Sequence, residues 1–245
     1  EWPLALYQPS LQGIDPFATD LTDQQKFNIL QECKWNPWYF FREVARFPGK
    51  SGSKPIQYKA NRGNMALTWS FLNHIDFALI MIRQAGKSGS TDQIHSYVTH
   101  VAGISSNSQI VTKDNALRKS NIERIKAIRD QLPPYMQLWD RHDSDNTQEI
   151  TCNALKNRIG TAVAQKSEDA ADNMGRGLSA QILHFDEGPY ISNIDISMGV
   201  ALASATEMRD LARAAGGFYG NIFTTTAGKK DTKEGKYFYD LVHNG

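Results

Sequence analysis

The sequence has little cysteine, almost no net charge and no long apolar run, and each shortage excludes a class of protein. Its two cysteines, Cys33 and Cys152, form no C-x-x-C pair, so we expect buried thiols in a reducing compartment such as the cytoplasm. Because the net charge is +1, any contact with DNA must come from a local basic patch. The longest apolar run, residues 77–82, is too short to cross a bilayer, so no membrane partner is expected.

What remains is the pattern of a globular α/β protein. The 245 residues are 40% hydrophobic and 22% charged, which suits one large domain with a buried core. Strands that alternate with helices predict a mainly parallel central sheet flanked by helices. We interpret residues 1–60, which are irregular and rich in aromatics, as an N-terminal flank or lid, and residues 61–245 as the core. Predicted strands cover 77–82, 108–113, 180–187 and 219–226, with two short ones within 148–164, and predicted helices cover 64–72, 114–132 and 193–214.

A phosphate-binding loop is predicted where the first strand meets a helical pattern. Residues 83–88 read RQAGKS and end like G-x-x-x-x-G-K-[ST], but Met81 stands where the first glycine belongs. In a strand–loop–helix context, backbone N–H groups hold phosphate oxygens, while Lys87 reaches the β- and γ-phosphates and Ser88 ligates Mg²⁺. The alternative is an ordinary β–α turn. The predicted phosphate-binding residues are Arg83, Gln84, Ala85, Gly86, Lys87, Ser88 and Gly89.

Two carboxylates end the strand predicted over residues 180–187. At such a position Asp186 can hold Mg²⁺ through a water molecule, and Glu187 can act as the base that orients the attacking water. The alternative is that both acids begin a solvated loop. His184 has no ligand partner at useful spacing, so we interpret it as a packed strand residue.

Three hydroxyls, those of Thr224, Thr225 and Thr226, end the last predicted strand. Their functional use is to sense the γ-phosphate and relay its loss, and the alternative is that they are only β-branched strand residues. A phosphate loop, an acidic strand and a polar strand, in that order, predict a RecA-like P-loop NTPase of the type with an additional catalytic glutamate (ASCE).

Several segments together resemble the ATPase domain of the large terminase subunit, the DNA-packaging motor of tailed bacteriophages. The resemblance runs from about residue 31 to the end. It rests on the phosphate loop RQAGKS, the acidic strand ILHFDE, the coupling motif IFTTTAG, the upstream segment NPWYFFREV and the Arg-Gly segment GRGLSAQILHFDEGPYI.

The resemblance implies an enzyme that hydrolyses ATP with Mg²⁺ to move double-stranded DNA into a procapsid. It implies that Arg83 contacts the γ-phosphate from within the loop and that Gln57 contacts adenine, with Asn61-Arg62 standing where the family has a Tyr-Gln pair. Arg176 is either a finger that reaches a neighbouring subunit or a brace for the loop before the acidic strand.

The implied partners are double-stranded DNA, a portal protein, a small terminase subunit and further copies of the chain in a pentameric ring, in the host bacterial cytoplasm. The family also has a C-terminal nuclease. No second acidic cluster follows residue 226, so we expect that domain, and DNA cleavage, to be absent from this chain.

Two other functions stay open at this point. A helicase-like translocase would usually continue its acidic motif as D-E-A-[DH], whereas here Gly188-Pro189-Tyr190 follows the two acids. A nucleotide-binding scaffold without turnover would leave Arg83 and Glu187 unused.

Overall fold

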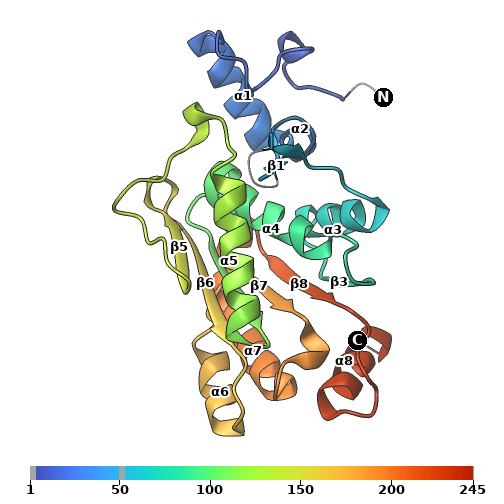
Figure 1. Ribbon diagram of the computed structural model, residues 1–245. Helices are drawn as coiled ribbons and strands as arrows, with labels where there is room; N and C mark the ends of the chain where they lie inside the picture. The colour runs from blue at the N-terminus through green and yellow to red at the C-terminus, as the bar shows by residue number, and fades with distance from the viewer. Residues whose placement is uncertain (1–3, 50–52, 245) are drawn as a thin grey trace.

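A six-stranded sheet forms the centre of the protein. The computed structural model describes residues 4–49 and 53–244. Five neighbouring strands are parallel and the last, β5, runs antiparallel to β6, so the predicted mainly parallel sheet is confirmed (Figure 1). The order across the sheet is β3 (Phe77–Ile80), β8 (Gly220–Thr225), β7 (Ile182–Asp186), β4 (Asn107–Thr112), β6 (Asn157–Val163) and β5 (Glu149–Cys152).

Helices cover both faces of this sheet. On one face lie α4 (Lys87–Tyr97), which continues as the π-helix η3 (Val98–Ala102), and α5 (Asn115–Arg129). On the other face α7 (Ile194–Ala214) and α8 (Lys233–Asn244) pack on the strands, and α6 (Glu168–Arg176) packs on α7. Short 3₁₀ turns, η4 (Pro134–Met136), η5 (Asn153–Leu155) and η6 (Gly188–Tyr190), join these elements.

Alternate side chains of β7 point to opposite faces of the sheet, so the sequence of this strand sets which side chains lie on each face. All five residues of β7 are buried, because it is an inner strand. Leu183 and Phe185 pack with α7, while Ile182, His184 and Asp186 point to the opposite face, toward α4 and α5. Two polar side chains therefore lie inside the core on the α4–α5 face, beside the helix that follows the phosphate loop.

The first 60 residues are more ordered than the sequence predicted, so the description of this part as irregular was wrong. α1 (Asp23–Trp35) is a helix of 13 residues, started by a capping box between Thr22 and Gln25. Its sequence, DQQKFNILQECKW, gives no clear apolar stripe because only Ile29, Glu32 and Cys33 are buried. The other elements here are η1 (Pro9–Leu11), α2 (Pro37–Tyr39), η2 (Phe40–Val44), the antiparallel pair β1 (Arg46–Phe47) and β2 (Ile56–Gln57), and α3 (Arg62–Leu72).

This N-terminal part packs into the same core as α4, through contacts such as those of Phe40 and Phe41 with Tyr97. The division at residue 60 stays a prediction.

The strand that precedes the phosphate loop lies at the edge of the sheet. We expected a strand buried between helices on both faces, but β3 pairs only with β8, and Ile80 is 43% exposed. The expectation failed because a short apolar run does not distinguish an edge strand from an inner one.

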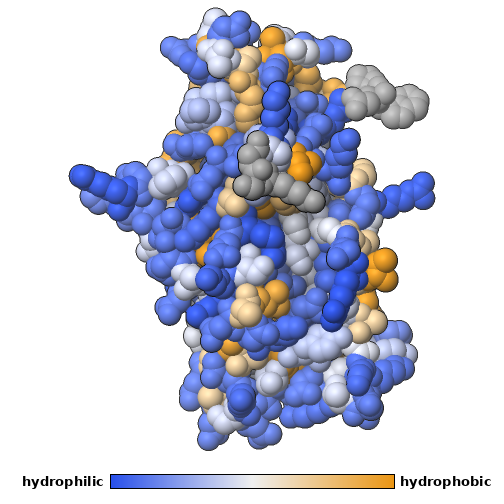
Figure 2. Space-filling view, in the orientation of Figure 1, coloured by the Kyte–Doolittle hydropathy of each residue, from blue (hydrophilic) through white to orange (hydrophobic). Residues whose placement is uncertain are grey.

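Both cysteines are free and buried, as predicted. No helix among the described residues has the length and apolar character needed to span a membrane. The face of the molecule in Figure 2 is mostly hydrophilic, with small separate hydrophobic areas.

Candidate functional site

The loop after β3 has the backbone geometry of an anion-binding turn. Gln84 and Gly86 have positive φ angles of 63° and 81°, and α4 begins directly afterwards at Lys87. Within the described residues, no backbone N–H group of residues 83–89 donates a hydrogen bond. These free donors at the start of a helix form a site suited to phosphate oxygens.

The missing first glycine has a structural explanation. Met81 still belongs to the sheet ladder, because its N–H donates to the Thr225 carbonyl at 3.1 Å, and its φ is not positive. Nothing at this position therefore requires glycine. The close approach is made by Gly63 instead, where an added Cβ would lie 3.1 Å from the Met81 sulfur.

Neighbouring elements hold the loop in place. The Asn61 side chain caps α3 by accepting from the Asn64 N–H and donates from Nδ2 to the Ala85 carbonyl at 2.9 Å. A Cβ on Gly89 would lie 2.9 Å from the Phe47 ring, so this position of α4 requires glycine.

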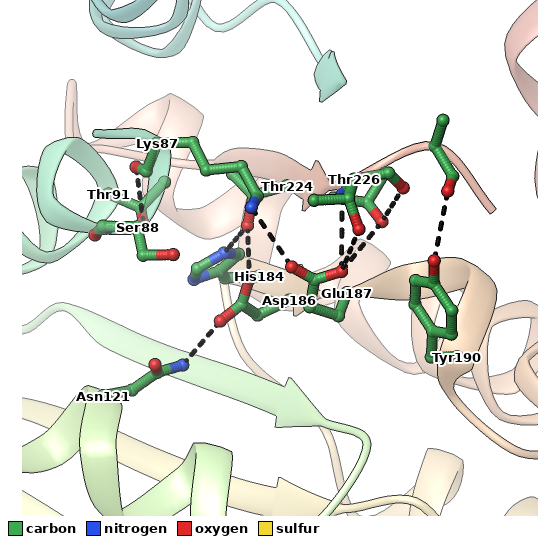
Figure 3. A network of polar contacts seen from close by, with 12 residues as sticks. Lys87, Ser88, Thr91, Asn121, His184, Asp186, Glu187, Tyr190, Thr224 and Thr226 are labelled. Carbon is green, nitrogen blue, oxygen red and sulfur yellow. Dashed lines mark hydrogen bonds and ion pairs between the residues drawn. The ribbon is translucent and has the colours of Figure 1, made fainter. Parts of the chain in front are cut away.

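Lys87 and Glu187 form an ion pair at the centre of the site. The Lys87 Nζ lies 3.1 Å from Glu187 Oε1, and both side chains are largely buried. Glu187 Oε2 accepts from the N–H and the hydroxyl of Thr226 at 3.3 and 3.1 Å (Figure 3). Burial would raise the pKa of Glu187, but the Lys87 ammonium and the Thr226 donors outweigh it and hold the pKa below its ordinary value.

The backbone of Glu187 is left-handed, with φ 62° and ψ 46°. A non-glycine residue in this region is strained, and such strain is found at functional sites. The turn separates the two neighbouring carboxylates, because it directs Glu187 toward the loop while Asp186 stays inside the sheet.

Asp186 has a different environment from its neighbour. It is 0% exposed, and its two oxygens accept from Asn121 Nδ2 and from Thr224 Oγ1, each at 2.9 Å. Burial raises its pKa although these two donors counteract the shift. The two acids thus have pKa values shifted in opposite directions, which is typical of paired carboxylates with separate roles.

The coupling threonines lie between the two acids and the phosphate loop because β8 separates β3 from β7. Thr224 contacts Asp186, and Thr226 contacts Glu187. As expected, His184 is a buried strand residue, and its Nε2 lies 2.8 Å from Thr224 Oγ1.

The remaining predicted residues lie in three places. Ser88 is half-buried in the first turn of α4, next to Lys87. Arg83 is exposed and has no hydrogen bond or ion pair with any residue that the structure describes. Arg176 ends α6, is 69% exposed and pairs with Asp172 at 2.7 Å, apart from the network of Figure 3.

Gln57 lies in β2, where its Nε2 donates to the Arg42 carbonyl at 2.7 Å. It lines a largely apolar groove of about 700 Å³ together with Trp38, Phe41, Tyr58 and Met65. The groove lies beside the start of α4, because one of its lining residues, Tyr58, donates from its hydroxyl to Ser90 Oγ in the first turn of that helix.

Sequence reasoning missed His95 and Asn121, which contact His184 and Asp186, and it named Asn61 beside the adenine site without predicting its contact with Ala85. They come from three helices far apart along the chain, and no short motif contains them. One signal was present for Asn121, since it lies four residues after Leu117 and four before Ile125, on the buried stripe of α5.

Comparison with known proteins supports the fold. The structure is similar to the large terminase of bacteriophage HK97, with a TM-score of 0.56 and 8% identity, over 82% of this chain and 40% of that chain. Two further similar structures are the large terminase ATPase domain of Thermus phage P74-26 (TM-score 0.47, 14% identity, 75% and 69% of the two chains) and the UvsW helicase of bacteriophage T4 (0.44, 11%, 85% and 70%). No protein-family model and no curated protein matches the chain.

The predicted α/β fold with a mainly parallel central sheet flanked by helices is therefore confirmed, and so is the resemblance to large terminases at the level of the fold. The chain spans 40% of the length of the HK97 protein.

Replacing Lys87 by methionine should raise the pKa of Glu187. The substitution removes the ammonium that lowers this pKa and leaves the burial that raises it. Carboxyl-carbon NMR of the protein without nucleotide measures the change, with Lys119→Met as the control because Lys119 is exposed and pairs with Glu123, not with Glu187. An unchanged Glu187 titration in the Lys87 variant would show that the ion pair does not form in solution.

Proposed function

We propose that this chain is the ATPase part of a viral DNA-packaging motor, which hydrolyses ATP with Mg²⁺ to drive double-stranded DNA into a procapsid. The observation that carries the proposal is that Glu187 contacts both Lys87 Nζ and the Thr226 hydroxyl, each at 3.1 Å, beside a turn suited to phosphate. The sequence motifs RQAGKS, ILHFDE and IFTTTAG resemble those of large terminases, and this resemblance supports the motor part of the proposal.

The ion pair suggests how ATP would prepare the site. In the structure the Lys87 ammonium is held by Glu187. Phosphate oxygens of bound ATP would compete for this ammonium, because the N–H groups of residues 83–89 hold them beside it. Glu187 would then lose its cationic partner, regain basicity and accept the proton of the attacking water, while the Thr226 N–H keeps the carboxylate oriented.

The oxygen donors fit Mg²⁺, which prefers hard oxygen ligands and usually keeps several waters. The Ser88 hydroxyl would bind it directly, and Asp186, whose buried carboxylate is already fixed by two donors, would hold it through water. When bound, the ion neutralises charge on the β- and γ-phosphates.

The adenine end of ATP would lie in the groove lined by Trp38, Phe41 and Gln57. An aromatic and apolar groove suits a flat base, and its connection through Tyr58 to α4 places it near the phosphate loop. Gln57 would contribute a polar contact to the base, and comparison of ATP with GTP in the same binding assay tests this assignment.

As the motor of a phage, the protein would work in the host bacterial cytoplasm. There it would act with double-stranded DNA, a portal protein, a small terminase subunit and other copies of itself in a pentameric ring. Since the chain spans 40% of the HK97 terminase, these partners belong to the proposal for the whole protein. Mass measurement of the chain mixed with DNA and nucleotide tests ring formation.

Glu187→Gln should keep ATP binding and lose turnover. Glutamine has the shape of glutamate but cannot accept the proton, and loss of a general base lowers kcat by about 10²–10⁴-fold.

Asp186→Asn should instead raise the Mg²⁺ concentration needed for activity, and Lys87→Ala should abolish nucleotide binding. The measurement is phosphate release with and without EDTA, and exposed Glu207→Gln is the control. Equal, mild effects at Glu187 and Asp186 would contradict the division of roles, and a wild type without hydrolysis would favour the scaffold.

Arg83→Ala should lower kcat with little change in nucleotide affinity, because an arginine that stabilises transition-state charge contributes about 10³–10⁵-fold. If Arg176 acts on a neighbouring subunit, Arg176→Ala should lower only the part of the activity that grows with protein concentration. Arg213→Ala removes an equally exposed helical arginine and serves as the control. If Arg83→Ala has the wild-type kcat at saturating ATP, Arg83 does not stabilise the transition state and can act only in nucleotide binding.

Thr225→Val/Thr226→Val should keep ATP binding but lose coupling, because valine keeps the strand shape and deletes the hydroxyls. The assay is packaging of double-stranded DNA into empty procapsids by the full-length protein that contains this chain, beside hydrolysis by the same preparation. Exposed Thr206→Val on α7 is the matched control. Normal packaging by the double variant would leave these threonines with a packing role only.

A further inference from the structure

A continuous path of polar contacts runs through Asp186 on the α4–α5 face of the sheet, and because both of its ends lie on α4 we call it the polar ring. It begins and ends on α4, at two residues one helical turn apart. Its members are Asp92, Arg124, Asn121, Asp186, Thr224, His184 and His95.

One arc of the polar ring runs through α5. Arg124 Nε donates to Asp92 Oδ2 at 2.6 Å, and its Nη2 donates to Asn121 Oδ1, also at 2.6 Å. Because Asn121 Oδ1 accepts from Arg124, the Nδ2 end of the amide faces the sheet. Its Nδ2 therefore donates to Asp186 at 2.9 Å.

The other arc runs through β8 and β7. The single proton of the Thr224 hydroxyl is donated to Asp186 Oδ1, so His184 Nε2, at 2.8 Å from that hydroxyl, must be the donor to it. His184 Nδ1 is then an acceptor and takes the proton of His95 Nε2 at 3.1 Å. The geometry thus gives both imidazoles one defined tautomer.

Both histidines are 1% exposed and stacked, and His184 is neutral in this arrangement because one of its ring nitrogens donates a hydrogen bond while the other accepts one. Two neutral imidazoles can transmit an orientation through directed hydrogen bonds without adding charge beside Asp186. A core that needed only packing would place apolar side chains here, because buried polar groups are costly unless every contact is satisfied.

We propose that His184 and Asn121 are positioning residues for Asp186, and that the polar ring fixes this carboxylate relative to α4, the helix that carries Lys87 and Ser88. The inference rests on the proposed function, because the purpose of this alignment is to present Asp186 and Ser88 together to Mg²⁺ and nucleotide. Partners that hydrogen-bond to a metal ligand commonly change metal affinity by 10–100-fold when they are removed.

Asn121→Leu removes the donor to Asp186 Oδ2, and His184→Phe removes the donor that orients the Thr224 hydroxyl toward Asp186 Oδ1. Both substitutions keep a similar size. We expect each to weaken Mg²⁺-dependent binding of ADP by about 10-fold or more, while binding of ADP in EDTA is unchanged. His184→Gln keeps a donor at the Nε2 position and should recover most of the loss. Calorimetric titration measures the binding, circular dichroism checks folding, and exposed Lys119→Ala is the control.

Imidazole nitrogen NMR gives a second readout that needs no nucleotide. Wild type should show His184 and His95 as neutral Nε2–H tautomers, and Asn121→Leu should keep those tautomers because it interrupts the other arc. Other tautomers in wild type would refute the polar ring, even if neither variant folds.

Different measurements would refute the positioning role and the proposed function. A wild type that binds ADP with Mg²⁺, beside folded variants whose Mg²⁺ dependence equals that of wild type, would refute the positioning role alone. A wild type that binds no nucleotide at all would refute the proposed function and this inference with it.

Discussion

A carboxylate inside a protein core is costly unless its oxygens receive hydrogen bonds, and Asp186 sets this constraint at the centre of the molecule. It is fully buried at the end of the inner strand β7, with one donor from α5 and one from β8. Three elements that are distant in sequence are therefore fixed relative to one another by a single side chain. The sheet order follows the same requirement, since β8 can supply its threonines only by lying directly beside β7.

The next residue shows how two adjacent acids obtain different chemistry. Asp186 follows the strand direction and stays in the core, whereas the left-handed backbone of Glu187 directs its side chain toward Lys87. Burial raises the pKa of Asp186, whereas at Glu187 the Lys87 ammonium and the Thr226 donors together outweigh burial, so the two pKa values shift in opposite directions. One strained residue thus produces two distinct carboxylates, and this strain is tolerated because the Thr226 N–H and hydroxyl bind the Glu187 side chain.

The parts of the fold that the sequence predicted correctly are those with strong local periodicity. Strands near residues 108–113, 180–187 and 219–226 are present, and so are the helices predicted after the first two of them, because their periodicity and turn residues lie in consecutive positions. α8, which follows the third strand, was not predicted. α1 was missed because it buries only three residues and its start depends on a capping box rather than an apolar stripe. The edge position of β3 was also missed, since strand order arises from contacts between distant segments.

The same limit applies to the candidate site. The ends of β3, β7 and β8 could be found because each carries a compact motif, and parallel strands bring their carboxyl ends to one edge of the sheet. The partners Asn61, Asn121 and His95 are single polar residues on separate helices, and only the folded chain shows that they meet the loop, the acid and the buried histidine.

The variant phosphate loop shows where glycine is needed in such a turn and where it is not. Glycine is favoured where φ is positive or where another group approaches closely, and Met81 meets neither condition because it still pairs with Thr225 in the sheet. Those requirements fall instead on Gly86, whose φ is 81°, and on Gly89, which faces the Phe47 ring. The side chain at position 81 is accommodated by Gly63 on α3. The first glycine of the pattern G-x-x-x-x-G-K-[ST] therefore corresponds to no constraint of this backbone. Its second glycine corresponds to the positive φ of Gly86, and its lysine to the ion pair of Lys87 with Glu187.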